Sequence, residues 1–302
     1  MLFYSVLTYN WTKRKLLHRN GLPDMQQLFR DVRFPHLGIV IDSLGKTINI
    51  GNFSIAYYGI VIALGMVAGF FMASWQATRL GQDKDIYLDL ALWDIIFAII
   101  GARLYYVIFS WDYYGKHPME ILNTRGGGMA IYGGVIAGVL TTFIFAKVKK
   151  LSFFDLTDAA CGGLLVGQIF GRWGNFFNRE AFGGYTDNLF AMQLKRSQVR
   201  AGDMTKDVLK HLVNIDGIQY IQVHPTFLYE LLWNIGVLAV VLLWTKKRKY
   251  KGQLFLIYLC GYGLGRCWIE GLRTDQLKFF GTQIAISQIL SAVLFLGAAG
   301  IL

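Results

Sequence analysis

Proline and low-complexity sequence are both scarce in this chain of 302 residues. It has four prolines and no tract rich in serine, glutamine or proline. Long disordered linkers have such compositions, so the sequence predicts one compact body without an extended tether. No internal repeat is apparent.

Cysteine is also rare, with only Cys161, Cys260 and Cys267. All three lie inside apolar stretches, no pair has CxxC spacing, and no histidine stands close to them in sequence. A structural zinc site or a redox pair would need such neighbours. We therefore predict that these cysteines are buried thiols.

Charged residues make up only 16% of the chain, whereas hydrophobic residues make up 54%. The mean hydropathy of +0.40 exceeds what the surface of a soluble protein tolerates, so the lipid bilayer is the expected solvent. The formal net charge is +11, but the basic residues are spread between apolar runs and form no single basic face. An anionic membrane surface is therefore the expected partner, and nucleic acid is not.

Seven apolar segments approach the roughly 20 residues that a helix needs to cross a hydrocarbon core of about 30 Å. They are Ser54 to Ala77, Leu88 to Ser110, Met129 to Phe145, Phe153 to Phe170, Thr226 to Trp244, Gln253 to Glu270 and Thr282 to Leu302. The sequence thus predicts an all-α integral membrane protein with seven transmembrane helices. Basic residues in the loops at 79–84, 147–150 and 246–251 fall on one side of this arrangement. By the positive-inside rule that side is cytoplasmic, which leaves the N-terminus outside and the C-terminus in the cytoplasm.

The loop at 174–223 is the only sizeable polar region between the predicted helices. Its stretches Leu189 to Leu194 and Ile218 to Val223 are strand-like, and Thr205 to Val213 is a candidate short helix. We predict a small extracytoplasmic α/β cap there, as the head of a transmembrane domain at 51–302. Residues 1–50 are predicted to form an N-terminal extension and interfacial arm that is unstructured or lies along the surface.

Several arginines and a glutamate occur at membrane depth, where each costs several kcal/mol unless it is paired or faces a wet cavity. Arg103 lies within the second segment, Arg172 follows the fourth, and Arg266 and Glu270 end the sixth with Arg273 one turn on. An i,i+4 pair such as Arg266 and Glu270 could simply neutralise itself. Guanidinium groups from different helices, however, match phosphate oxygens in a bidentate way. Arg172 and Arg266 are therefore predicted to clamp the phosphate of an anionic lipid head group.

His224 and Glu230 stand at the start of the fifth segment, beside Pro225. Proline is harmless in a first helical turn, where its missing N–H would have no partner. A carboxylate about one turn into an apolar helix does need a partner, so Glu230 is either half of a structural ion pair or a catalytic group.

Glycines cluster around the start of the third apolar segment. Residues 126–128 are three glycines that precede it, and Gly133 and Gly134 follow Tyr132 within it. Small residues let membrane helices approach each other closely, which explains most of these positions. Those that flank Tyr132 would also admit a substrate to the backbone, and Gly133 is our candidate for that role.

Six motifs then follow one another in order along the chain. They are Tyr57-Tyr58-Gly59, Gly101-Ala102-Arg103, Gly128-Met129-Ala130-Ile131-Tyr132-Gly133-Gly134, Gly171-Arg172-Trp173-Gly174-Asn175 through to Glu180, His224-Pro225-Thr226-Phe227-Leu228-Tyr229-Glu230, and Gly265-Arg266 through to Glu270. Together they resemble the bacterial prolipoprotein diacylglyceryl transferase family. The resemblance runs from about Gly51 to the end of the chain, and six motifs in the right order are far more specific than any one of them.

This resemblance implies a seven-helix enzyme of the bacterial inner membrane. Such an enzyme moves the diacylglyceryl group of phosphatidylglycerol onto the lipobox cysteine of a preprolipoprotein, which its signal peptide anchors in the membrane. A thioether forms, glycerol phosphate leaves, and no metal or organic cofactor is required. By the same resemblance Arg172 and Arg266 contact the lipid, and four residues support that site: Tyr58, Asn175, Glu180 and Glu270.

The residues themselves agree with this chemistry. A sulfur that attacks an sp³ carbon must be a thiolate, and its phosphate leaving group must be stabilised as charge builds. Arg172 and Arg266 would stabilise that phosphate, while Glu180 and Glu270 hold the arginines in place. Three further residues complete our set of substrate-binding candidates: Arg103, Gly133 and His224.

Tyr132 departs from the pattern of many family members, in which a histidine stands before Gly-Gly. A histidine can accept a thiol proton near neutral pH, whereas an ordinary tyrosine ionises only in alkaline solution. Tyr132 would therefore position the lipid, act as a phenolate, or leave proton removal to Glu180, His224 or water. The general base stays open among these.

A transporter or flippase that binds an anionic lipid at midplane arginines without making a bond is the rival hypothesis. Such proteins often have two related halves or paired broken helices. The sequence has no such internal symmetry, which favours the transferase.

Overall fold

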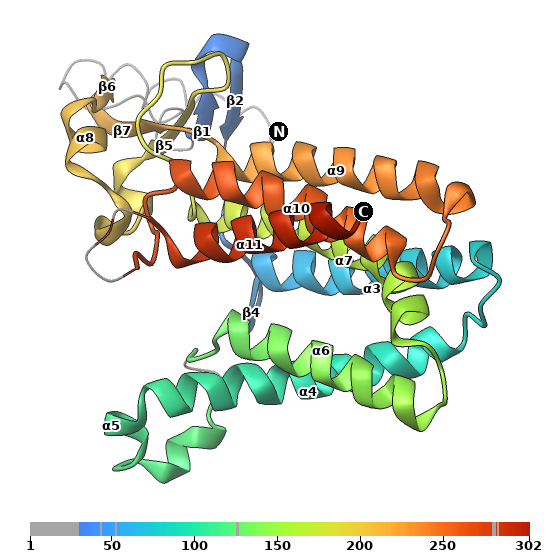
Figure 1. Ribbon diagram of the computed structural model, residues 1–302. Helices are drawn as coiled ribbons and strands as arrows, with labels where there is room; N and C mark the ends of the chain where they lie inside the picture. Colours follow the sequence, from blue (N-terminus) through green and yellow to red (C-terminus); the bar gives the residue numbers. More distant parts are fainter. Residues whose placement is uncertain (1–29, 43, 52, 125–126, 280–281, 283) are drawn as a thin grey trace, which may run out of the picture. The chain divides into compact units, whose positions relative to one another are not determined.

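The computed structural model describes residues 30–302 except for 43, 52, 125–126, 280–281 and 283. The first part of the predicted N-terminal extension, residues 1–29, therefore lies outside the described residues, as does Gly126. Within the described part, a helix is present at each of the seven predicted segments (Figure 1). These helices are α3 (Tyr57–Arg79), α4 (Ile86–Phe109), α6 (Ile131–Val148), α7 (Phe153–Asn178), α9 (Thr226–Trp244), α10 (Gln253–Leu272) and α11 (Ile286–Ile301).

Five stretches of the described chain are long and apolar enough to cross a membrane: α3, α4, α6, α7 and Thr226–Lys247, which contains α9. This is the composition of a multi-pass membrane protein. The helix α10 is less apolar because it carries Arg266 and Glu270, and α11 has only 16 residues.

The chain divides into two compact units, and we describe each by itself. The first unit comprises residues 1–65, 168–236 and 260–300, and the second comprises 66–167, 237–259 and 301–302. The boundaries fall inside α3, α7, α9, α10 and α11, so each of these helices contributes residues to both units.

The first unit contains a five-stranded antiparallel sheet in the order β2-β1-β5-β7-β6. Its strands are β1 (Arg30–Phe34), β2 (Ile39–Asp42), β5 (Met192–Lys195), β6 (Val213–Ile215) and β7 (Ile218–Val223). The strands β5 and β7 and the short helix α8 (Lys206–Lys210) confirm the predicted elements of the 174–223 loop. Asp216 and Gly217, both with positive φ, form the tight turn between β6 and β7.

Residues 30–42 belong to this sheet, because Val32 of β1 pairs with Leu194 of β5. One face of the sheet is closed by a core of apolar side chains with exposures of 7% or less. This core includes Val32, Phe34, Phe176, Phe182, Leu194, Ile221, Val223 and Phe227. Since Phe176 and Phe227 come from α7 and α9, the sheet is anchored to the helix ends that carry the candidate site.

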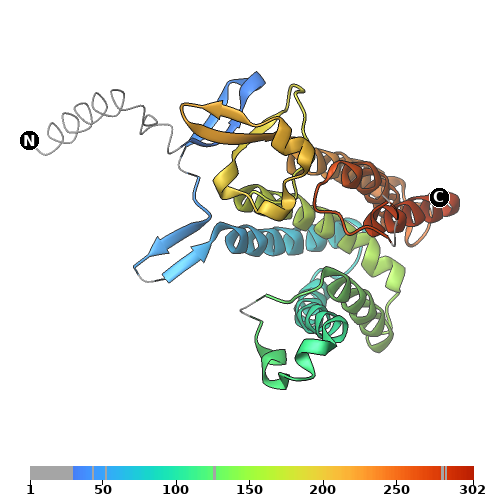
Figure 2. The same cartoon turned by 90° about the vertical axis from the view of Figure 1, so that its left-hand side faces the viewer.

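A separate two-stranded hairpin, β3 (Thr47–Ile50) and β4 (Phe53–Ala56), leads directly into α3. Figure 2 shows this hairpin as an arm at the start of the helix. The predicted boundary at residue 50 falls inside the hairpin.

The second unit is built on close contacts between helix backbones. The antiparallel helices α4 and α6 lie side by side (Figures 1 and 2), and a Cβ added at Gly133 would collide with the carbonyl oxygen of Gly101. In the same way, a Cβ at Gly69 of α3 would lie 2.8 Å from the carbonyl oxygen of Gly163 of α7. These contacts confirm that small residues allow the membrane helices to approach closely. Between α4 and α6 stand the short helix α5 (Trp111–Tyr114) and a 3-10 helix, Pro118–Leu122.

Candidate functional site

Arg172 and Arg266 meet at one carboxylate in the first unit. The Oε2 atom of Glu230 lies 3.1 Å from Nη1 of Arg172 and 3.0 Å from Nη1 of Arg266. The three side chains come from the end of α7, the first turns of α9 and the end of α10. The structure thus brings together the two arginines of the predicted clamp, and the carboxylate that joins them is Glu230.

A second carboxylate extends this cluster. Glu270 pairs with Arg266 at 2.6 Å and with Arg273 at 3.7 Å, and its Oε1 accepts a hydrogen bond of 2.7 Å from Ser287 at the start of α11. Arg273 in turn donates to both carboxylate oxygens of Asp275, at 2.9 and 2.7 Å. We call this set the site network: Arg172, Glu230, Arg266, Glu270, Arg273 and Asp275.

The site network is electrically balanced, and its two glutamates are buried. It holds three guanidinium groups and three carboxylates, and the exposed fraction of the Glu230 side chain is only 3%. Burial alone would raise the pKa of Asp275, but the hydrogen bonds and charge of Arg273 outweigh it and lower that pKa. Without a bound anion, the six charges therefore compensate one another.

Three polar atoms of the site network are nevertheless buried without a hydrogen-bond partner among the described residues: Nε of Arg172, Oε1 of Glu230 and Oε2 of Glu270. Oε2 of Glu270 still has a cation beside it, because it lies 2.6 Å from Arg266 in an ion pair, so Nε of Arg172 and Oε1 of Glu230 are the two atoms with neither kind of contact. Such atoms are rare in folded proteins, because losing water without a replacement bond costs about 1–3 kcal/mol. An unused guanidinium donor next to an unused carboxylate acceptor is the arrangement that a ligand with both an anionic oxygen and a proton donor would complete.

Glu180 does not hold these arginines, contrary to our expectation. Its Oε1 accepts hydrogen bonds from Asn175 at 3.3 Å and Asn178 at 3.2 Å, and its Oε2 lies 3.4 Å from the exposed Arg200. The reason is local: α7 ends at Asn178, and Arg179 with φ of +55° turns the chain away from the helix axis. Glu230, which sequence reasoning left undecided, has the role expected of Glu180.

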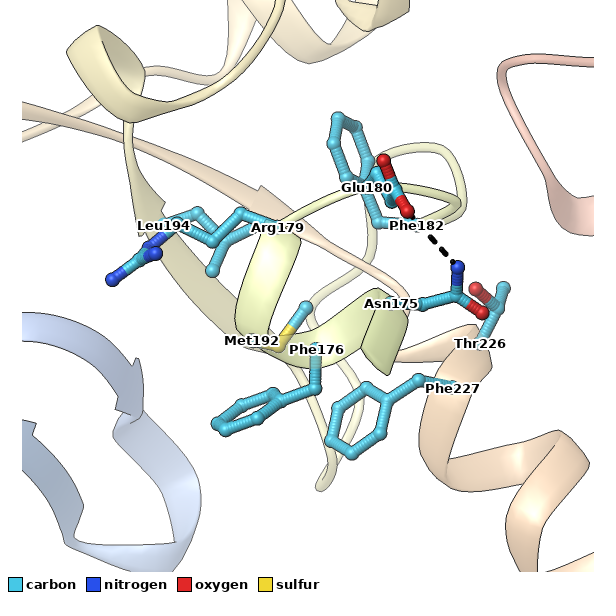
Figure 3. A pocket seen from close by; sticks show the side chains of 9 residues that line it. All are labelled: Asn175, Phe176, Arg179, Glu180, Phe182, Met192, Leu194, Thr226 and Phe227. Carbon is cyan, nitrogen blue, oxygen red and sulfur yellow. Dashed lines mark hydrogen bonds between the residues drawn. The ribbon is translucent and has the colours of Figure 1, made fainter. Parts of the chain in front are cut away.

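The turn after α7 is strained on both sides of Glu180, since Ala181 also has a positive φ of 58°. Beside it lies a narrow cavity with room for about one water molecule. In Figure 3 the Asn175 amide faces Glu180 at this cavity, while the Arg179 side chain, which also lines the cavity, extends away from Glu180. Glu180 is thus held at a fixed place by two amides, in an unusual backbone conformation.

Tyr58 packs against the helix that carries Arg172. A Cβ added at Gly174 would lie 2.7 Å from the Tyr58 ring, so glycine is required there. The neighbouring ring of Tyr57 stacks on Phe177 with centroids 5.1 Å apart. The two tyrosines therefore fix the first turn of α3 against the last turns of α7.

His224 lies just before α9 and is held by backbone and side-chain contacts. Its backbone N–H donates to Gly184 O at 3.0 Å, its C=O accepts from Gly183 at 2.9 Å, and its Nδ1 lies 3.3 Å from the Tyr229 hydroxyl. Burial lowers the pKa of His224 below the usual 6.5, which favours the neutral ring.

Arg103, Tyr132 and Gly133 belong to the second unit. The Arg103 side chain is directed into the loop that precedes α6, where its N–H groups meet backbone carbonyl oxygens. Gly133 packs against Gly101, which gives it a clear packing role, and Tyr132 is half-buried in the first turn of α6. The described residues contain no group of His, Cys, Asp and Glu side chains that could hold a metal ion.

Comparison with known proteins agrees with the motif order. The model of the family described as prolipoprotein diacylglyceryl transferase matches residues 46–302. A phosphatidylglycerol–prolipoprotein diacylglyceryl transferase of Bacillus licheniformis is 44% identical over 253 residues, which cover 84% of this chain and 89% of that protein. The protein of the same name from Bacillus cytotoxicus is 43% identical over 238 residues, which cover 79% and 84%. The chain therefore belongs to the prolipoprotein diacylglyceryl transferase family.

Proposed function

We propose that this protein transfers the diacylglyceryl group of phosphatidylglycerol to the thiol of the lipobox cysteine of preprolipoproteins. The names of the relatives and the match over residues 46–302 support the reaction. The observation that carries the proposal is the buried Nε of Arg172, which has no partner among the described residues, on the same guanidinium that pairs through Nη1 with the Glu230 carboxylate shared with Arg266. That edge fits an oxygen of the lipid phosphate.

The reaction is a displacement at an sp³ carbon. The cysteine sulfur forms a bond to the glyceryl carbon, the bond from that carbon to the phosphate oxygen breaks, and glycerol phosphate departs with the electron pair. The thiol proton is lost to a base, and the departing phosphate gains negative charge. Stabilising a charge that develops in the transition state is the largest contribution that fixed donors make to catalysis.

In this proposal Arg172 and Arg266 bind the phosphodiester and stabilise the departing phosphate. The negative charges of Glu230 and Glu270 offset the repulsion between the two guanidinium groups, and their ion pairs fix the direction of each guanidinium. Because the charges of the site network balance, a bound lipid phosphate adds one uncompensated negative charge. That charge favours the uptake of the thiol proton by a neighbouring base. Tyr58 and Asn175 support the end of α7.

Glu180 and Tyr132 are the proposed catalytic groups for proton removal. Glu180 has the advantage of a fixed carboxylate, held by Asn175 and Asn178 and only weakly paired with the exposed Arg200. His224 is neutral near pH 7 because burial lowers its pKa, but its Nδ1 faces the Tyr229 hydroxyl. We therefore assign His224 to the support of the α9 start. In the second unit Gly133 stays a proposed substrate contact, whereas the bonds of Arg103 to backbone carbonyls give that residue another task.

We further propose that all seven long helices span the bacterial inner membrane, with the C-terminus in the cytoplasm and the N-terminus outside. The basic residues at 246–251 favour a cytoplasmic α9–α10 loop, and the five-stranded sheet would then be the extracytoplasmic head of the 51–302 domain, joined by strands from the 1–50 segment. Both substrates are membrane-anchored, so a lateral opening would admit phosphatidylglycerol and the signal peptide from the bilayer.

The test is a lipidation assay with purified protein in vesicles that contain phosphatidylglycerol and a peptide with a lipobox cysteine. We expect a thioether-linked diacylglyceryl peptide and one glycerol phosphate released per peptide. Two controls define specificity: a peptide with serine in place of cysteine, and vesicles of phosphatidylcholine with the same acyl chains. Movement of lipid between leaflets without any lipidated peptide would overturn the transferase and favour the flippase.

A further inference from the structure

Arg103 of the second unit is surrounded by backbone carbonyl oxygens. Its Nε donates to Ile121 O at 2.7 Å, and its Nη1 and Nη2 each donate to two further carbonyls, at 2.6 to 3.0 Å. The four further acceptors are the carbonyls of Glu120, Asn123, Gly127 and Gly128. The guanidinium also lies over the Tyr114 ring, 5.0 Å from its centroid, and the residue is only 7% exposed.

This geometry uses every donor that an arginine has. A guanidinium carries five N–H groups, and here each of the five has a carbonyl acceptor. A phosphate could bind Arg103 only after displacing several of these carbonyls and opening the loop. Arg172 differs, because its Nε is buried and has no acceptor in the part of the chain that the structure describes. The two arginines thus have different tasks, although both stand in apolar helices.

The five bonds define the path of the chain into α6. Gly127 and Gly128 have φ of +91° and +76°, and a Cβ added at Gly128 would collide with Nη1 of Arg103. Two residues later, the N–H of Ala130 donates to Ala102 O at 3.0 Å, and α6 then begins at Ile131. Tyr132 is the next residue, four positions after Gly128, which is the last residue that Arg103 contacts.

We infer that Arg103 is a positioning residue, which fixes the backbone at residues 120–123 and 127–128 and thereby the direction of Tyr132 in the transfer reaction. Its cation interacts with carbonyl dipoles of the protein and not with the lipid phosphate. This inference rests on the proposed function, because it takes transfer as the activity in which Tyr132 takes part. Lysine cannot replace arginine here, since its compact ammonium group has three donors and cannot reach five carbonyls.

The main experiment measures lipidation kinetics for Arg103→Lys and Arg103→Gln, each alone and combined with Tyr132→Phe. We expect both single variants to lower kcat about a hundredfold while KM for phosphatidylglycerol stays unchanged, because a misplaced group costs rate and not ground-state binding. In the Tyr132→Phe background the loss should be much smaller. A raised KM with unchanged kcat, or activity kept by lysine, would make Arg103 a phosphate ligand. Equal losses in both backgrounds would show that Arg103 does not act through Tyr132.

A matched glycine pair keeps the inference testable with Arg103 in place. Gly127→Ala and Gly128→Ala both place alanine at positive φ, but only at Gly128 would the new Cβ meet the guanidinium. At Gly127 no atom of the described residues lies within 4 Å of the new Cβ. We expect Gly128→Ala to lower kcat as Arg103→Gln does, and Gly127→Ala to lower it much less. Equal rates in the two alanine variants would overturn the inference.

Hydrogen exchange separates this inference from the proposed function. Arg103→Gln should speed amide exchange in residues 118–130 of the whole protein in vesicles, whether or not the protein lipidates a peptide. If exchange is faster in Arg103→Gln but the wild-type protein lipidates no peptide, the structural role of Arg103 stands and the proposed transferase function is wrong. Unchanged exchange in an active protein would remove the positioning role alone.

Discussion

Two ion networks of this protein, each built around a buried carboxylate, differ in whether the polar atoms of their carboxylates and arginines are all partnered. The site network of the first unit leaves Nε of Arg172 and Oε1 of Glu230 with neither a hydrogen bond nor an ion pair among the described residues, and Oε2 of Glu270 with ion pairs alone. The second unit has a network of its own, which we call the anchor network: Asp155, Asp158, Arg248 and Lys251. The site network has polar atoms that a ligand could bind, whereas the anchor network only stabilises the fold.

Every carboxylate oxygen of the anchor network has a donor. Asp158, fully buried in α7, accepts from Arg248 at 3.0 Å and from the backbone N–H groups of Gly252 and Phe255 at 2.7 and 2.8 Å. Asp155 accepts from Arg248 at 3.0 Å and pairs with Lys251 at 2.6 Å. Asp158 thus caps the start of α10 and closes the loop between α9 and α10. A network completed in this way leaves nothing for a substrate to bind.

The largest contrast is expected between Arg172→Ala and Arg248→Ala, whose native side chains are both 19% exposed. Loss of Arg172 should lower the rate of lipidation by about 10²–10³-fold, because it removes donors aimed at the departing phosphate. Loss of Arg248 leaves Asp158 buried without its cation and should destabilise the protein by about 3–5 kcal/mol. Specific activity of the inserted protein and its melting temperature in detergent measure the two effects. An Arg172→Ala protein with full activity would remove the phosphate clamp.

A second contrast compares Glu230→Gln with Asp158→Asn, each of which removes a buried negative charge without changing shape. Both should lower the melting temperature. Only Glu230→Gln leaves two arginines facing a ligand site with excess positive charge, so added phosphatidylglycerol should raise its melting temperature more than it raises that of the wild type. Asp158→Asn should respond to the lipid as the wild type does. Equal responses of the two variants would mean that the lipid phosphate binds elsewhere.

The sequence predicts the elements of this protein better than the contacts between them. Long apolar runs locate the helices, and alternation locates β5 and β7, because both patterns are local. The pairing of Val32 with Leu194 joins distant parts of the chain, and no local pattern indicates it. For the same reason the sequence predicts only an extension at residues 30–42, whereas the structure has two strands of the sheet there.

The candidate site was predictable in its charges and less so in its partners. A glutamate in an apolar helix must have a cation, which made Glu230 notable, but spacing alone could not say that it holds two arginines from different helices. Glu180 was misassigned as their partner because the positive φ of Arg179 is invisible in the sequence. The partners of Arg103 were hidden for another reason: carbonyl oxygens occur at every residue, so the sequence carries no sign of where they converge.

A smaller effect tests the second carboxylate of the site network. Ser287→Ala removes the hydroxyl that donates to Glu270 at 2.7 Å, and a hydrogen bond to a charged group contributes about 1.5–3 kcal/mol. Because Glu270 keeps its pairing with Arg266, we expect only part of that energy to appear, as a roughly tenfold lower kcat. Ser291→Ala is the matched control one turn along α11, where the hydroxyl donates to the Ser287 carbonyl within the helix. Unequal melting temperatures with equal rates would make Ser287 a purely structural residue.

The smallest expected effect is the pH dependence contributed by His224 at the start of α9. Burial lowers its pKa in the folded protein, so the unfolded chain binds a proton first as the pH falls through about 6.5. Stability should therefore be unaffected by this group above pH 7 and should decrease between about pH 6.5 and the lower folded pKa. Since the ring is only half-buried, solvent screening keeps the change small. Melting temperatures at pH 7.5 and 5.5 measure it, and His224→Gln should reduce the difference. If the melting temperature of that variant changes as much between the two pH values, another group causes the acid sensitivity. The stability of the α9 start, where Glu230 lies, would then not depend on the protonation of residue 224.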